Sequence, residues 1–157
     1  MTPSDPSREK VSFGRLLWAG PLTIAVAAVI NLVLRAVARA VLNPGPAFSP
    51  LQGPLATFLT VAGTLGAVIA FAIVGALSRR PRRVFLIVSI VVLGLSFLPA
   101  LALLFAPAMP AGGAGPGSMP LGDVTLPNVL ALMVMHTAAW ATCITLLPRL
   151  ALRPAAR

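Results

Sequence analysis

Four long stretches without a charged side chain constrain the fold of this chain more than any other feature. They run over 16–34, 55–77, 84–105 and 126–147, and His136 is their one ionisable side chain apart from Cys143. At a rise of about 1.5 Å per residue, a helix of about 20 residues matches a hydrocarbon core of about 30 Å. Backbone amides in lipid must be satisfied within the segment, so each stretch should be helical. We therefore predict membrane-spanning helices over about 16–38, 55–77, 84–105 and 126–147.

The composition supports a membrane environment. Charged residues make up only 10% of the chain and hydrophobic residues 58%, whereas a soluble domain carries about a quarter charged residues. Twelve Lys and Arg against three Asp and Glu give a net charge of +9. Because these basic residues lie between the apolar stretches, we expect them to bind anionic lipid headgroups and so anchor the protein in the lipid bilayer. We do not expect nucleic acid as a partner.

The basic residues are unevenly divided between the two sides of such a bundle. The amino-terminal segment carries three, the link after the second stretch four and the carboxyl-terminal tail three, against only Arg35 and Arg39 on the other side. We expect the protein to lie in the inner (cytoplasmic) membrane of the cell. Since Lys and Arg accumulate in cytoplasmic segments, both ends of the chain should face the cytoplasm. The predicted fold is an all-α bundle of four transmembrane helices in two antiparallel hairpins. Its membrane domain covers 16–150, and residues 1–15 and 151–157 form basic cytoplasmic segments.

Several arginines are candidate interface anchors. Asn31, Arg35 and Arg39 follow one another at four-residue spacing and so share one helix face. Snorkelling of the two arginines to the headgroups is the favoured interpretation, and an anion or lipid-headgroup site on this stripe is the alternative. The cluster in the short link supplies the remaining anchors, which are Arg79, Arg80, Arg82 and Arg83.

His136 is the best single candidate for a functional residue within the membrane, and Asn31 is the second. An ionisable group at that depth is a functional hypothesis by default. Helical spacing puts His136 on one face with Met133, Trp140 and Cys143. The structural interpretation, which we favour, is a neutral imidazole hydrogen-bonded to a neighbouring helix, for instance to Asn31, Ser89 or a backbone carbonyl. A single histidine without a charged partner forms no proton relay.

The second stretch carries a pattern of small residues suited to helix packing. Gly63 and Ala67, and likewise Gly66 and Ala70, are four residues apart, which is the spacing that lets two membrane helices approach closely. We expect this face to pack within the bundle or against a partner, as a homo-oligomer or in a larger membrane complex.

The sequence contains no catalytic constellation. Its acidic residues, Asp5, Glu9 and Asp123, all lie outside the apolar stretches, and proton-coupled exporters generally need a carboxylate within the membrane. The methionines, His136 and Cys143 show no recognised ligand spacing for Cu(I). We predict neither an enzyme nor a metal or other cofactor. The leading hypothesis is a structural or accessory membrane protein, and the alternative is a carrier for a small solute with His136 lining its path. An enzyme acting on lipid is the weakest hypothesis.

Four segments of the chain form a recognisable set together with the position of His136. They are GRLLWAGPL at 14–22, LTVAGTLGAV at 59–68, SRRPRRVF at 78–85 and LSFLP at 95–99. In these segments the chain resembles a family of small bacterial four-pass membrane proteins classed as a domain of unknown function. The resemblance extends from about Phe13 to Leu150. It implies the topology described above and no activity. Ala100 stands where the family pattern has an acidic residue, which argues against a role for a charge there.

Overall fold

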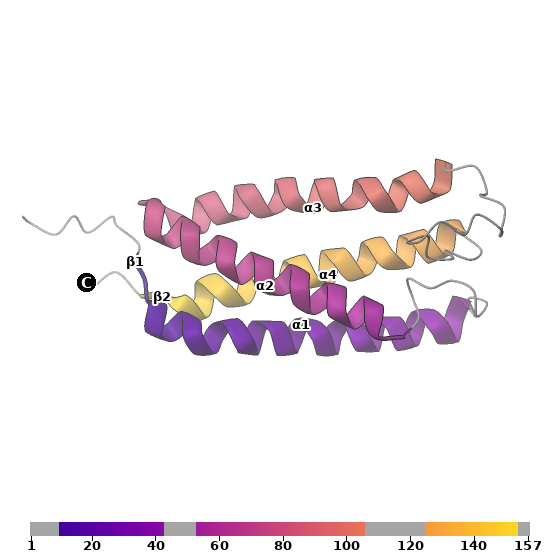
Figure 1. Ribbon diagram of the computed structural model, residues 1–157, viewed down its shortest axis with the longest axis horizontal. Coiled ribbons are helices and arrows are strands. Elements are labelled where there is room, and N and C mark those ends of the chain that lie inside the picture. Colours follow the sequence, from indigo (N-terminus) through magenta and orange to yellow (C-terminus); the bar gives the residue numbers. More distant parts are fainter. Residues whose placement is uncertain (1–9, 43–52, 106–124, 154–157) are drawn as a thin grey trace, which may run out of the picture.

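The structure is a computed structural model that describes residues 10–42, 53–105 and 125–153. It contains four long helices, α1 (Phe13–Leu42), α2 (Gly53–Leu77), α3 (Pro81–Phe105) and α4 (Leu126–Ala151), which lie lengthwise beside one another (Figure 1). All four are long and apolar enough to cross a bilayer. The predicted all-α fold with four helices is confirmed, and the chain is a multi-pass membrane protein.

The helices begin and end where backbone chemistry allows. Pro54, Pro81 and Pro127 lie in the first turns of α2, α3 and α4, where the missing N–H would have had no partner in the helix. The helix α1 extends beyond the predicted 16–38 at both ends and α4 continues beyond 147. Helices of this kind do not stop at the edge of the hydrocarbon, because their backbone hydrogen bonds are internal on both sides of it.

The bundle has two distinct ends. At the terminal end α1 and α3 begin and α2 and α4 finish, and at the opposite end, called the loop end below, α1 and α3 finish (Figure 1). The most extensive contact joins α1 to α4, although these helices are farthest apart in sequence. The helices α2 and α3 are linked by Ser78–Arg80, where the Arg80 N–H donates to Ser78 Oγ at 3.1 Å, and they diverge toward the loop end (Figure 1).

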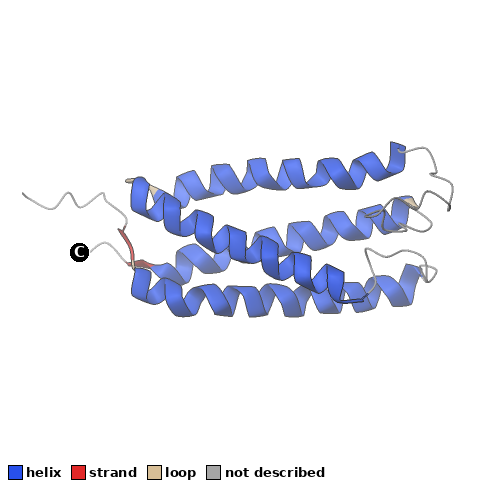
Figure 2. Ribbon diagram, viewed as in Figure 1, coloured by secondary structure: helices blue, strands red, loops and turns tan. Residues whose placement is uncertain are grey.

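A small β-clamp joins the two ends of the described chain. Strand β1 (Lys10–Val11) pairs antiparallel with β2 (Leu152–Arg153), with Val11 opposite Leu152 (Figure 2). The Ser12 N–H extends the pairing by donating to the Ala151 carbonyl at 2.9 Å. The pairing was not predicted from the sequence, because two-residue strands leave no periodic pattern.

The best-packed part of the bundle lies toward the terminal end. There the rings of Phe71 in α2 and Phe85 in α3 meet edge to face, with centroids 4.9 Å apart and an interplanar angle of 76°. The same cluster includes Cys143 from α4. In contrast, large apolar side chains such as Leu77 (84% exposed) and Phe105 (83%) point away from the protein. Such an exposed apolar surface is typical of helices that face lipid.

Hydroxyl groups inside the helices are mostly satisfied by their own helix. Thr23, Thr64 and Thr142 each donate to the carbonyl four residues earlier at 2.7–2.8 Å. In a bilayer such local bonds remove the cost of an unsatisfied hydroxyl. These threonines therefore need no partner from another helix.

Candidate functional site

Side-chain hydrogen bonds connect α1 to α2 and α3 to α4. In the first, Asn31 Nδ2 donates to Thr60 Oγ1 at 2.9 Å, and in the second, Trp140 Nε1 donates to Ser89 Oγ at 3.1 Å. Ser89 thus bonds to Trp140 and not to His136, for which the sequence had offered it as one possible partner. Asn31 occupies the more enclosed of these positions, because only 6% of it is exposed.

The direction of the Asn31 amide follows from its partner. The single proton of the Thr60 hydroxyl is donated to the Ala56 carbonyl at 2.9 Å, so Thr60 Oγ1 can only accept from the Nδ2 group of Asn31. The Oδ1 atom of Asn31 is then left buried, and it has no hydrogen-bond partner within the described residues. A buried acceptor without a donor is costly, and an ordered water often satisfies such an atom.

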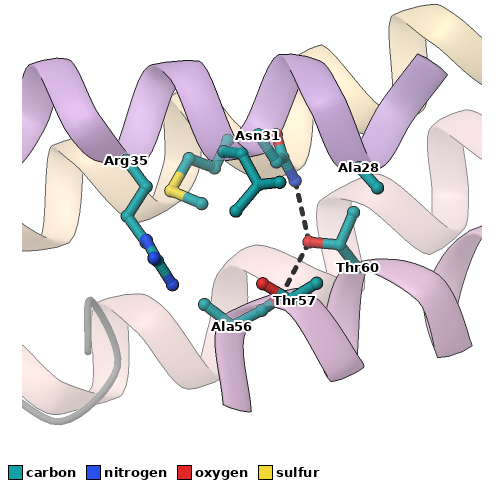
Figure 3. A pocket seen from close by; sticks show the side chains of 8 residues that line it. Ala28, Asn31, Arg35, Ala56, Thr57 and Thr60 are labelled. Atoms are coloured by element: carbon teal, nitrogen blue, oxygen red, sulfur yellow. Dashed lines mark hydrogen bonds between the residues drawn. The ribbon is translucent and has the colours of Figure 1, made fainter. Parts of the chain in front are cut away.

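Asn31 lies beside a small hollow near the loop end, which we call the Arg35 pocket (Figure 3). Its volume of about 10 Å³ corresponds to the space that one water molecule requires. Three helices line it, with the residues Ala28, Asn31, Leu32 and Arg35 of α1, Ala56, Thr57 and Thr60 of α2, and Met135 of α4.

The structure separates the two arginines of the predicted stripe. Arg35 is half-buried and reaches from α1 toward the side of the pocket formed by Ala56 and Thr57 (Figure 3). Arg39, one turn farther along α1, is exposed and does not line the pocket. Sequence analysis found Asn31 and Arg35 but missed Thr57. The available signal was a line of threonines at 57, 60 and 64, spaced for one face of α2.

His136 lies at an uncovered part of α4. Its neighbours seven residues away on the same face, Val129 and Cys143, are 0% and 4% exposed, yet His136 itself is exposed. The Nδ1 atom is 2.7 Å from the Leu132 carbonyl oxygen. Because a carbonyl can only accept, Nδ1 is the donor in this contact. This carbonyl belongs to α4 itself, whereas the sequence interpretation had expected a hydrogen bond to a neighbouring helix.

The small residues of α2 divide between two environments. Ala67 is half-buried against the core cluster and Ala70 is also half-buried, whereas Gly63 and Gly66 are exposed. A Cβ atom placed on either glycine would meet no atom within 4 Å. Of the two settings expected for this stripe, within the bundle or against a partner, the first does not apply to the two glycines. Their small size serves no contact among the described residues.

The predicted anchors of the short link lie together at the terminal end. Arg79, Arg80, Arg82 and Arg83 are all exposed, as are Arg15 at the start of α1 and Arg149 at the end of α4. In the described part of the chain, no three His, Cys, Asp or Glu side chains come together in a group suited to a metal ion.

Comparison of the chain with protein-family models, with curated proteins and with solved structures found no match. The resemblance to the four-pass bacterial family therefore stays a prediction from sequence.

Proposed function

We propose that this protein is a non-enzymatic structural or accessory component of a membrane that associates laterally through the exposed small-residue face of α2. This face is defined by the exposed Gly63 and Gly66 together with Ala70, which is half-buried. The partner is a second copy of the chain or a subunit of a larger membrane complex.

The observation that carries this proposal is a contrast between the glycines of the bundle. A Cβ atom on Gly20 would lie 3.1 Å from Cγ1 of Val68, and one on Gly75 would lie 2.8 Å from Cβ of Val11. Contacts within the chain leave no room for a Cβ at Gly75 and only tight room at Gly20. Gly63 and Gly66 have no such contact, although glycine costs about 1 kcal/mol relative to alanine in a helix measured in water. Close approach of a partner helix gives a reason for both.

The test is the oligomeric size of the Gly63→Leu/Gly66→Leu double variant in mild detergent or nanodiscs. Two leucines on this face would hold a partner backbone away, so we expect the associated fraction to fall about tenfold, which corresponds to about 1.4 kcal/mol. The matched control is Gly94→Leu, because Gly94 of α3 is also exposed and also has nothing within 4 Å of a Cβ. An unchanged size of the double variant, or an equal loss with Gly94→Leu, would contradict the proposal.

The carrier alternative is distinguished from this proposal by a substitution at His136. A carrier requires His136 beside a solute path, but His136 is not among the residues that line the Arg35 pocket, and that pocket accommodates only one water. On the accessory proposal, His136→Leu leaves folding and association unchanged. On the carrier alternative, the same substitution abolishes solute uptake or export.

The distribution of charge supports an orientation for the bundle. Ten of the twelve basic residues belong to segments at the terminal end or adjoining it, and Arg35 and Arg39 are the other two. We infer that the terminal end faces the cytoplasm and anionic headgroups of a bacterial inner membrane. An alkaline phosphatase fused to either end of the chain should be inactive in the cell, and a fluorescent protein at the same place should mature. Active phosphatase at either end would reverse the orientation.

A further inference from the structure

The β-clamp brings basic residues from both ends of the chain to one place. Its register sets Lys10 of β1 directly opposite Arg153 of β2, at the end of the strand pair that is farther from the helices (Figure 2). Like charges directly opposite each other destabilise a strand pair. Arg15 in the first turn of α1 and Arg149 in the last turn of α4 lie only a few residues from the clamp, and both are exposed. Closing the clamp therefore gathers four cations at the terminal end.

No described carboxylate offsets this positive charge. The ranges 10–42, 53–105 and 125–153 contain no aspartate and no glutamate. Repulsion between neighbouring cations falls when an anion lies close to all of them. None of the described residues supplies that anion.

Apolar packing and a backbone hydrogen bond hold the clamp together against this repulsion. Val11 and Leu152, which lie opposite each other, both pack against the core cluster, and Val11 lies against Gly75 of α2. The Ser12 N–H donates to the Ala151 carbonyl at 2.9 Å. A pair of such short strands is only marginally stable. An anion that binds the closed clamp more tightly than the open one therefore shifts the clamp toward its closed form.

The lipid surface lies directly beside the clamp. Arg15 is followed on α1 by Leu17 and Trp18, which are 80% and 50% exposed and so face lipid in a membrane-spanning helix. Tryptophan at the end of such a helix is typical of the headgroup level. The anions within reach of Arg15 are therefore phospholipid phosphates of the leaflet at the terminal end. A headgroup with a net negative charge offsets cations better than a zwitterionic one, whose own cation neutralises its phosphate.

We propose that the β-clamp is a binding site for an anionic phospholipid, which holds the clamp closed. The lipid phosphate lies beside Lys10, Arg153, Arg15 and Arg149 and lowers the repulsion among them. In a purely zwitterionic membrane the clamp opens more often and releases the two ends of the chain from the bundle. The site depends neither on the lateral association of α2 nor on which side of the membrane the terminal end faces.

The test is hydrogen exchange of the Ser12 amide, measured by mass spectrometry on the full chain in nanodiscs. This amide is bonded across the clamp to Ala151, so its exchange reports opening of the clamp. Exchange should be about tenfold slower in phosphatidylcholine mixed with phosphatidylglycerol than in phosphatidylcholine alone, which is the gain for a ligand at about ten times its dissociation constant. Inorganic phosphate added to phosphatidylcholine nanodiscs should not slow it. Equal slowing by inorganic phosphate would overturn the lipid as the source of the anion.

Substitutions at Arg153 distinguish relief of repulsion from a general effect of the lipid, and they leave the sequence around Ser12 unchanged. Arg153→Gln removes one cation, so exchange in phosphatidylcholine alone should already be slower than in the wild type. Arg153→Glu sets an opposite charge across from Lys10 and should give slow exchange in both lipids.

The matched control is Arg39→Gln, which removes the same charge from the exposed end of α1 at the loop end and should behave like the wild type. Equal exchange of the wild type in the two lipids would overturn the proposal. So would a lipid dependence in Arg153→Glu as large as in the wild type, or a loss of the lipid dependence in Arg39→Gln.

Discussion

Replacing Gly75 with alanine is expected to open the β-clamp that joins the two ends of the chain. The added Cβ would collide with Cγ2 of Val11 and lie 2.8 Å from its Cβ, a separation that real side chains do not tolerate. The backbone of Val11 is fixed by its pairing with Leu152 in β2, so Val11 cannot easily move away from the added atom. Overpacking of this kind costs about 1–3 kcal/mol, which should appear as lower resistance of the helical circular dichroism signal to SDS in mixed micelles.

Two further variants show whether this loss comes from the contact between Val11 and Gly75. Val11→Ala combined with Gly75→Ala removes the colliding methyl groups and should recover most of the stability, giving a coupling energy in a double-mutant cycle. Gly94→Ala adds a methyl group where no atom lies within 4 Å and should not destabilise the protein. If Gly75→Ala behaves like Gly94→Ala, the packing of β1 on α2 is not as described.

Truncation of Phe71 is expected to loosen the bundle near its terminal end. Phe71 is fully buried and packs edge to face on Phe85. In a water-soluble core Phe→Ala costs about 3–5 kcal/mol, of which part is transfer from water. Lipid is as apolar as the core, so only the packing part remains in a bilayer. A void of about 100 Å³ at about 24 cal/mol per Å³ gives about 2 kcal/mol.

Cys143 reports this change directly. It belongs to the same cluster and is 4% exposed, so its thiol should react slowly with a maleimide in the wild type and much faster in Phe71→Ala. The control is Phe58→Ala, because Phe58 lies on the same helix with 65% of its surface exposed and contributes little to the bundle. Equal thiol reactivity in all three proteins would exclude Phe71 from the core that shields Cys143.

The sequence predicted the part of the candidate site that belongs to α1 but not the part that belongs to α2. The spacing of Asn31 and Arg35 along one helix face requires no knowledge of the partner helix. Thr57 and Thr60 belong to α2, and nothing in their local pattern states that they face Asn31 and not lipid. Hydroxyls in membrane helices can bond to their own backbone on either face, as Thr145, exposed on α4, does with Ala141. The pairing of Asn31 with Thr60 is therefore a tertiary fact.

For His136 and the glycines of α2, too, the sequence pattern did not reveal which other helix, if any, covers them. Helical spacing placed His136 on one face with Cys143, which is 4% exposed, yet His136 itself is exposed. Gly63 and Gly66 permit a close approach without requiring one, and the bundle packs on other residues of α2, including Thr64 and Phe71. Apolar side chains cover every side of such a helix, so no amphipathic pattern marks its packing face.

The amino-acid sequence alone determined that four helices cross a membrane, since an amide in hydrocarbon must be bonded within its own segment and a charge must stay near water. Both requirements concern only one segment and the solvent around it, so they can be read from the sequence without knowing the neighbouring helices. Only the tertiary structure decided that α1 packs most extensively on α4, that β1 pairs with β2, and that Arg35 and Thr57 line one pocket. In lipid the helices gain no hydrophobic energy by meeting, so their partners are chosen by shape and by a few hydrogen bonds that exist only once the helices are in contact.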